Sequence, residues 1–170
     1  MKISNIVATV TLNHPFNLEF LSQNIQNVQI HPKVHWLKYR IPQNNSYIAF
    51  YKSGKFLVTA RSLKQLNENA RTILEMLEKI GIKTEGWFID VHNIVAIDKI
   101  DLKTTIENLV SNMDLQKASF EPEQFPALIY KDWGVSILLF STGKIIITGG
   151  KNIDQVNAAV ESFQKLIDNL

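Results

Sequence analysis

The sequence predicts an α+β fold in which two tandem repeats each place helices on one face of an antiparallel sheet. Three observations predict it: a duplication of about half the chain, stretches of strand-like alternation, and long amphipathic helices at corresponding positions. At 170 residues, with 45% hydrophobic and 20% charged residues, the chain is long and apolar enough to bury a core. We expect the repeats at residues 1–85 and 86–170, closely joined as one domain.

The duplication is visible as short stretches that recur in the same order. Asn-Ile-Val-Ala at residues 5–8 returns 88 residues later at residues 93–96. Ser-Gly-Lys at 53–55 returns as Thr-Gly-Lys at 142–144, and Gln-Leu-Asn at 65–67 returns as Gln-Val-Asn at 155–157. The spacing drifts by one or two residues, as small loop insertions would cause. Two long units argue against a solenoid, which needs at least about three shorter ones.

The first repeat is expected to begin with a strand at residues 3–12, where polar and apolar residues alternate. Asn17 is a suitable N-cap for a short helix. Three or more strands follow across residues 34–60, separated by turn signals at 42–45 and 53–54. Apolar residues at 3.6-residue spacing then predict a helix over 62–80, and Gly81 stands where a C-terminal cap belongs.

The second repeat is expected to follow the same order. A strand at 91–97 precedes a short helix that carries Ile106 and Leu109. Further strands run through 127–149, and a last helix from about residue 153 turns Val156 and Phe163 inward.

The sheet face opposite the helices has an intermediate character. On that face strand parity places apolar side chains, two Asn, two Thr and peripheral Lys, including Asn5, Val7, Leu57, Thr59, Asn93, Val95, Ile97, Leu138, Ile146 and Thr148. A solvated face would be more polar, and a core face would not carry the amide, hydroxyl and ammonium groups.

Composition excludes several classes of protein. With no cysteine, the chain has no disulfide, no Cys-ligated metal and no thiol nucleophile. No apolar run approaches the roughly 20 residues of a membrane helix, and the N-terminus lacks a signal peptide, so we expect a cytoplasmic protein. Residues 1–85 carry 11 Lys/Arg against 5 Asp/Glu, whereas residues 86–170 carry 7 against 11. A basic half beside an acidic half favours two partners, with a polyanion for the first.

No catalytic or metal site is predicted. The four histidines, His14, His31, His35 and His92, lack metal-ligand spacing, and no Ser-His-Asp set can be assigned. The two Gly-Lys pairs lack the spacing of a Walker A motif. We therefore expect no enzymatic activity, no metal and no cofactor.

Several motifs resemble the TATA-box-binding protein family over nearly the whole chain. NIVATV at residues 5–10 and NIV at 93–95 are similar to that family's first strand in each repeat. EPEQFPALIY at 121–130 resembles the second-repeat motif EPELFPGLIY, and LLFSTGK at 138–144 and TGGK at 148–151 follow in the family's order. The resemblance implies a saddle whose ten-stranded antiparallel sheet places its concave face on the DNA minor groove, with helices on the convex side.

The resemblance also implies roles for individual residues. The sheet-face set above would contact bases and sugars, since the minor groove of A·T pairs offers mainly acceptors. Phosphate contacts, which make binding salt-sensitive, would come from Arg40, Lys55, Arg61, Lys131, Lys144 and Lys151. Wedges that kink the duplex would be Phe125 and Phe140 in the second repeat, with Tyr51 and Val34 in the first. Transcription factor B would contact Glu121, Glu123 and Gln124, the last replacing the usual Leu.

The first repeat departs from the family pattern. Its two expected wedge phenylalanines are absent: Tyr51 takes one position, and Val34 or His35 takes the other beside Trp36. Ala60-Arg61 also replaces the expected continuation TGAK. We expect weaker kinking at this end of the site.

Two functions follow as hypotheses. The first is an archaeal-type general transcription initiation factor, associated with the nucleoid, that binds A·T-rich promoter DNA, bends it and recruits transcription factor B and, through it, RNA polymerase. The second is a divergent paralogue that keeps the fold but acts through protein contacts, including self-association through the concave face.

Overall fold

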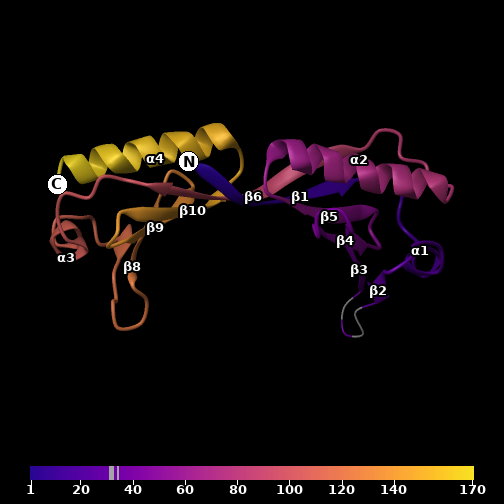
Figure 1. Ribbon diagram of the computed structural model, residues 1–170, viewed down its shortest axis with the longest axis horizontal. Coiled ribbons are helices and arrows are strands. Elements are labelled where there is room, and N and C mark those ends of the chain that lie inside the picture. Colours follow the sequence, from indigo (N-terminus) through magenta and orange to yellow (C-terminus); the bar gives the residue numbers. More distant parts are fainter. Residues whose placement is uncertain (31–32, 34) are drawn as a thin grey trace. The chain divides into compact units, whose positions relative to one another are not determined.

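The computed structural model describes residues 1–30, 33 and 35–170. Its described residues form one ten-stranded sheet and four helices (Figure 1), in the strand order β2-β3-β4-β5-β1-β6-β10-β9-β8-β7. Every strand pair with a determined register is antiparallel. The predicted α+β class with a ten-stranded antiparallel sheet is therefore confirmed.

The elements follow the same order in both halves of the chain. The strands of the first half are β1 (Lys2–Thr11), β2 (Gln29–Ile30), β3 (Trp36–Arg40), β4 (Tyr47–Tyr51) and β5 (Lys55–Ala60), with helices α1 (Leu18–Asn24) and α2 (Leu63–Lys79). Those of the second half are β6 (Phe88–Lys99), β7 (Ala118–Ser119), β8 (Ala127–Asp132), β9 (Val135–Phe140) and β10 (Lys144–Gly150), with helices α3 (Ile106–Val110) and α4 (Ile153–Asp168).

Two compact units make up the chain. One comprises Ile6–His92, and the other comprises Met1–Asn5 with Asn93–Leu170. The division falls within strands β1 and β6. One end of each of these strands therefore belongs to one unit and the other end belongs to the other unit.

In the unit Ile6–His92, α2 packs on the face of the sheet that carries Ile6, Ala8 and Val10, all fully buried. The Ser62 hydroxyl caps α2 by accepting a hydrogen bond from the Gln65 backbone N–H. The helix ends before Gly81, whose φ of 89° favours glycine, as the sequence predicts.

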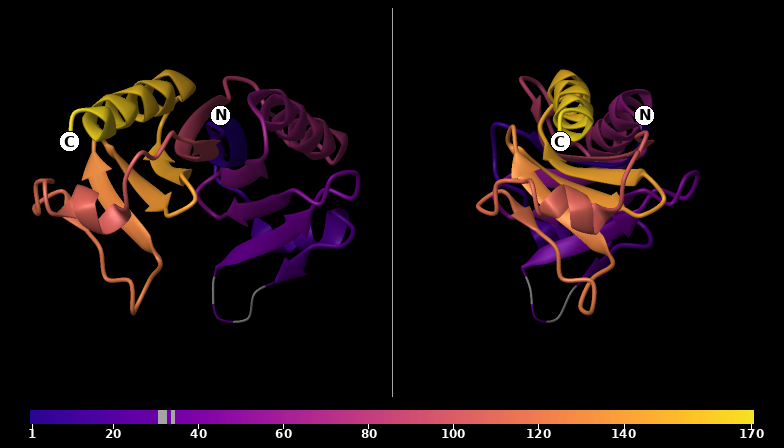
Figure 2. Two further views of the ribbon diagram at one scale, coloured as in Figure 1. Left: turned by 60° about the vertical axis from the view of Figure 1, so that its left-hand side comes forward. Right: turned by 90° about the vertical axis from the view of Figure 1, so that its left-hand side faces the viewer.

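In the other unit, α4 lies over the strands of that unit and packs on β10 (Figure 2). Asn152 caps α4 by accepting from the Gln155 N–H, and Phe163 is fully buried beneath the helix. In both units the residues opposite the helices are half-buried or exposed, and we call that side of each unit the open face.

Element boundaries agree closely with the sequence predictions, with two exceptions. Strand β6 is longer than the predicted 91–97, and the two-residue strands β2 and β7 are too short to produce a periodic signal. Asn17 caps α1 as expected, because its side chain accepts from the Phe20 N–H at 3.0 Å.

Candidate functional site

An apolar row crosses the open face of the unit that contains Asn93–Leu170. Cα pairing aligns Ile146 with Ile97 on one side and with Leu138 on the other, and aligns Leu138 with Ile129. All four side chains are half-buried. Three of them are predicted site residues, whereas Ile129 is an addition that the parity of β8 could have indicated. The row gives this face a strip of apolar side chains that extends across four strands.

Asn93 lies on the same face with a fixed orientation. Its Oδ1 accepts a hydrogen bond from the Gly149 backbone N–H at 2.7 Å. A backbone N–H only donates, so the amide oxygen must face Gly149 and the two amide hydrogens remain available as donors. The β6–β10 register shifts between Ile147 and Gly150, and the φ of Gly149 is 92°. This bulge re-aims the Gly149 N–H, as bulges commonly do beside functional sites.

The two threonines predicted to read bases have different surroundings. The Thr59 hydroxyl accepts from the Tyr47 N–H at 2.8 Å and lies 3.3 Å from the Tyr47 carbonyl oxygen, to which it can donate. Thr148 is paired through Cα with Ser136 and is half-buried. A hydroxyl has one proton to give, so Thr59 must release its strand contact before it can donate to a ligand.

The remaining predicted sheet residues also lie on the open faces. Val7 is the Cα partner of Thr59, and Leu57 is that of Thr9. Asn5 and Val95 belong with Asn93 to the same compact unit, and both are half-buried.

The predicted wedge residues Phe125, Phe140 and Tyr51 each lie in contact with a second aromatic ring. The rings of Phe125 and Phe140 meet edge to face with centroids 6.2 Å apart, and Phe125 is 39% exposed. In the other unit the rings of Trp36 and Tyr51 lie 5.8 Å apart. Burial raises the pKa of the Tyr51 hydroxyl, with a smaller contribution from Tyr47, so this hydroxyl stays protonated. The predicted wedge Val34 lies outside the described residues.

Strand register explains why Trp36 reaches this position. Trp36 is the Cα partner of Tyr51, just as Ala127 is the Cα partner of Phe140. Trp36 therefore replaces a small residue of the second repeat with a large ring. The sequence showed Trp36 only as a neighbour of the expected wedge position, and its pairing with Tyr51 depends on the register of β3 and β4.

The predicted phosphate-binding residues are all exposed: Arg40, Lys55, Arg61, Lys131, Lys144 and Lys151. The Arg40 guanidinium donates to the Asn45 carbonyl oxygen at 3.0 Å and lies 5.4 Å from the centroid of the Tyr47 ring, which fixes its position.

Two observations refine the lysine assignments. Lys144 is the Cα partner of Lys99, and both line a cavity of about 550 Å³. Lys99 was not predicted, although it continues the parity of Asn93 and Ile97. Asp132, which follows Lys131 in the sequence, accepts a hydrogen bond from a different lysine, Lys117, at 2.8 Å. This hydrogen bond lowers the pKa of the Asp132 carboxyl.

The acidic residues predicted to contact a partner lie in a tight turn. The Glu121 carbonyl oxygen accepts from both the Gln124 and the Phe125 backbone N–H at 2.9 Å. The side chains of Glu121, Glu123 and Gln124 are exposed, so the turn presents two carboxylates outward.

Within residues 1–30, 33 and 35–170, no group of His, Asp and Glu side chains is arranged to hold a metal ion. No helix in that part of the chain is long and apolar enough to span a membrane.

In each unit an open sheet face, rather than a cleft, carries the predicted site residues, and the predicted basic residues are exposed. The family model described as "Transcription factor TFIID (or TATA-binding protein, TBP)" matches residues 1–80 and 88–170. The chain belongs to this TATA-box-binding protein family, which is a family of transcription factors rather than of enzymes.

Individual relatives are similar over nearly the whole chain. The TATA-box-binding protein of Sulfolobus acidocaldarius is 35% identical over 99% of this chain and 87% of its own length. That of Aeropyrum pernix is 36% identical over 97% and 83%, and TATA-box-binding protein C of Halobacterium salinarum is 30% identical over 100% and 98%. The solved structure of Methanococcus jannaschii TBP superimposes with a TM-score of 0.89 at 25% identity, covering 99% of this chain and 98% of that one.

Proposed function

We propose that this protein is a general transcription initiation factor that binds the minor groove of A·T-rich TATA-box DNA through its open faces. The orientation of Asn93 carries the proposal. Its oxygen is held by Gly149, so it offers donors to a ligand. The minor-groove edge of an A·T pair presents only acceptors, whereas a G·C pair adds the N2 amino donor of guanine. A donor at this point therefore favours A·T pairs.

The apolar row supports the same ligand. A minor groove opened against a sheet presents sugar edges and base edges with few polar groups, which suit Ile97, Ile146 and Leu138. Asn5, Val7, Val95, Leu57, Thr59 and Thr148 complete the proposed base and sugar contacts. The exposed basic residues would reach phosphates, and their number predicts strong salt dependence.

The aromatic pairs would supply the bend. Proteins that bind the minor groove insert apolar or aromatic wedges between base steps and kink the duplex. Phe125 with Phe140 is one proposed wedge. The Trp36–Tyr51 pair is the other proposed wedge. Val34, the further wedge expected in the first repeat, lies outside the described residues.

The acidic turn would recruit the next factor. Glu121, Glu123 and Gln124 are exposed on the loop between β7 and β8, in the half of the chain that carries an excess of acidic residues. We assign this turn to contact with transcription factor B, through which RNA polymerase would be recruited.

A mobility-shift titration tests the proposal. The protein is added to a labelled TATA duplex and to a G·C-scrambled duplex across a salt series, with and without transcription factor B. We expect selective, salt-sensitive binding to the TATA duplex and a further shift with the factor. Phe125→Ala with Phe140→Ala should weaken the TATA complex. Equal, weak binding to both duplexes that transcription factor B does not improve would contradict the proposal and favour a paralogue that acts through protein contacts.

A further inference from the structure

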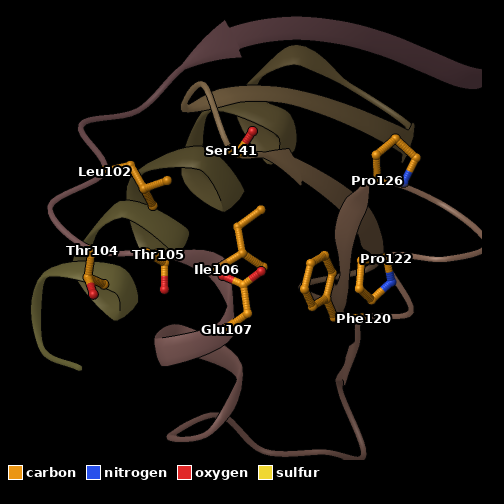
Figure 3. A pocket seen from close by; sticks show the side chains of 9 residues that line it. All are labelled: Leu102, Thr104, Thr105, Ile106, Glu107, Phe120, Pro122, Pro126 and Ser141. Atoms are coloured by element: carbon orange, nitrogen blue, oxygen red, sulfur yellow. The ribbon is translucent and has the colours of Figure 1, made fainter.

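A cavity lies beside the acidic turn, between α3 and the loop that joins β7 to β8. Its volume is about 360 Å³, at the lower end of the roughly 300–1,000 Å³ of ligand pockets. Figure 3 shows the two sides: Leu102, Thr104, Thr105, Ile106 and Glu107 come from α3 and the segment before it, facing Phe120, Pro122 and Pro126 from the loop, with Ser141 between them. The size suits one or two side chains of a partner rather than a large ligand.

The walls of the cavity combine apolar and polar side chains. Ile106 is 4% exposed, and Leu102 and Phe120 are half-buried, so they offer contact to methylene groups. The two threonine hydroxyls already accept hydrogen bonds within the α3 region, Thr105 from the Asn108 backbone and Thr104 from the Asn108 side chain.

Glu107 supplies the charge. It is exposed in the first turn of α3, and its side chain points toward the space between Ile106 and Phe120 (Figure 3). No ion pair to Glu107 is formed by the residues that the structure describes. The nearest lysine in sequence, Lys103, instead pairs with Asp168 at 3.5 Å.

We infer that this cavity takes a lysine or arginine side chain of the partner protein that contacts the acidic turn. A basic side chain matches both features, because its aliphatic stem can lie along apolar walls while its charged head pairs with a carboxylate. The loop that carries Glu121 and Glu123 also provides Phe120, Pro122 and Pro126, so the cavity continues the proposed contact surface. This inference rests on the proposed function for the partner's identity, transcription factor B.

Charge complementarity favours this occupant over nucleic acid. Glu107 lines the cavity, and Glu121 and Glu123 are exposed on the loop that forms its other side. Carboxylates at these positions attract a basic protein and repel nucleic acid. A second copy of this chain could also bring basic residues, those of residues 1–85, to this surface, and the thiol-labelling experiment below distinguishes that outcome.

A charge-neutral substitution tests the pairing. Glu107→Gln should weaken binding of transcription factor B to the protein–DNA complex roughly tenfold, with unchanged affinity for the TATA duplex alone. Glu19→Gln is the matched control, because Glu19 is the exposed acidic residue in the first turn of α1, the corresponding helix of the first repeat. Equal effects of the two substitutions would overturn the inference.

Thiol labelling tests the position without relying on DNA. The natural chain has no cysteine, so Ser141→Cys places a single thiol at the cavity. Saturating transcription factor B should slow the reaction of this thiol with a maleimide at least about fivefold. Ser111→Cys, at the opposite end of α3, is the control and should react at the same rate with or without the partner.

The outcomes separate the two proposals. If the wild-type protein binds the TATA duplex but the thiol of the Ser141→Cys variant is not protected, the inference fails and the proposed function stands. If the protein binds no TATA duplex but transcription factor B protects that thiol, the inference stands and the DNA-binding proposal fails. Protection of the same thiol by raising the concentration of this chain alone would place a second copy in the cavity and overturn the inference.

Discussion

At Asn93 the contribution of one side chain to the stability of the fold can be separated from its proposed contribution to DNA binding. Replacing it by Ala leaves the half-buried Gly149 N–H without its acceptor, which costs about 1–3 kcal/mol of stability. For a domain of this size each kcal/mol lowers the melting temperature by about 2–4 °C, so a loss of roughly 4–8 °C is expected at the centre of that range. Replacing it by Asp keeps an oxygen acceptor for Gly149, and the melting temperature should stay within about 2 °C of the wild type.

DNA binding should respond differently to the same two substitutions. Asn93→Asp removes both amide donors and adds a negative charge toward the duplex. A good base contact is worth about 1–3 kcal/mol, which corresponds to a roughly 5- to 150-fold loss of affinity for the TATA duplex. The melting temperature is measured by thermal unfolding monitored by circular dichroism. The affinity is measured by fluorescence anisotropy with a labelled duplex. An Asp variant that binds as tightly as the wild type, or that unfolds as early as the Ala variant, would refute the orientation inferred for Asn93.

Three further predictions concern the open faces. Lys144→Gln should make the plot of log affinity against log salt less steep by about 0.9, as loss of one phosphate contact does, whereas Lys64→Gln on α2 should leave the slope unchanged; equal slopes would exclude Lys144 from the interface. Thr148→Val should lower affinity about tenfold with little change in melting temperature, whereas Thr59→Val should lower the melting temperature by about 4 °C, since it removes the acceptor of a β4 amide. Trp36→Ala should reduce the bend of the duplex, measured by energy transfer between dyes at its two ends; an unchanged bend would show that Trp36 is not a wedge.

Local patterns were sufficient to predict the elements that position the site. The apolar spacing of residues 62–80 predicted α2, and the alternation in β1 and β6 placed Asn5 and Asn93 opposite the helices. These predictions succeed because burial of one face imposes a period that is readable along the chain. The sequence alone was therefore enough to predict which residue types the open faces carry, although not how their side chains are arranged.

Features that depend on pairing between distant strands could not be predicted in the same way. The Thr59 hydroxyl is occupied by Tyr47, twelve residues away, through the β4–β5 register. Trp36 faces Tyr51 only because of the pairing of β3 with β4. The bulge at Gly149, which orients Asn93, interrupts the pairing of β10 with β6. The periodicity of a sequence indicates which side chains are buried, but it does not indicate which residues of two paired strands form hydrogen bonds with each other.

Corresponding residues of the two repeats have different hydrogen-bond partners and different neighbours. Thr59 is tied to its neighbouring strand, whereas Thr148 forms a pair with the small Ser136, and the amide of Asn93 is oriented by a bulge. The first half of the chain carries the basic excess and the second half the acidic turn and cavity. Phosphate attraction depends on charge and tolerates loose geometry, but base reading and partner contact depend on oriented groups. We therefore expect the first repeat to contribute mainly to affinity and the second to sequence selection and to the order of assembly.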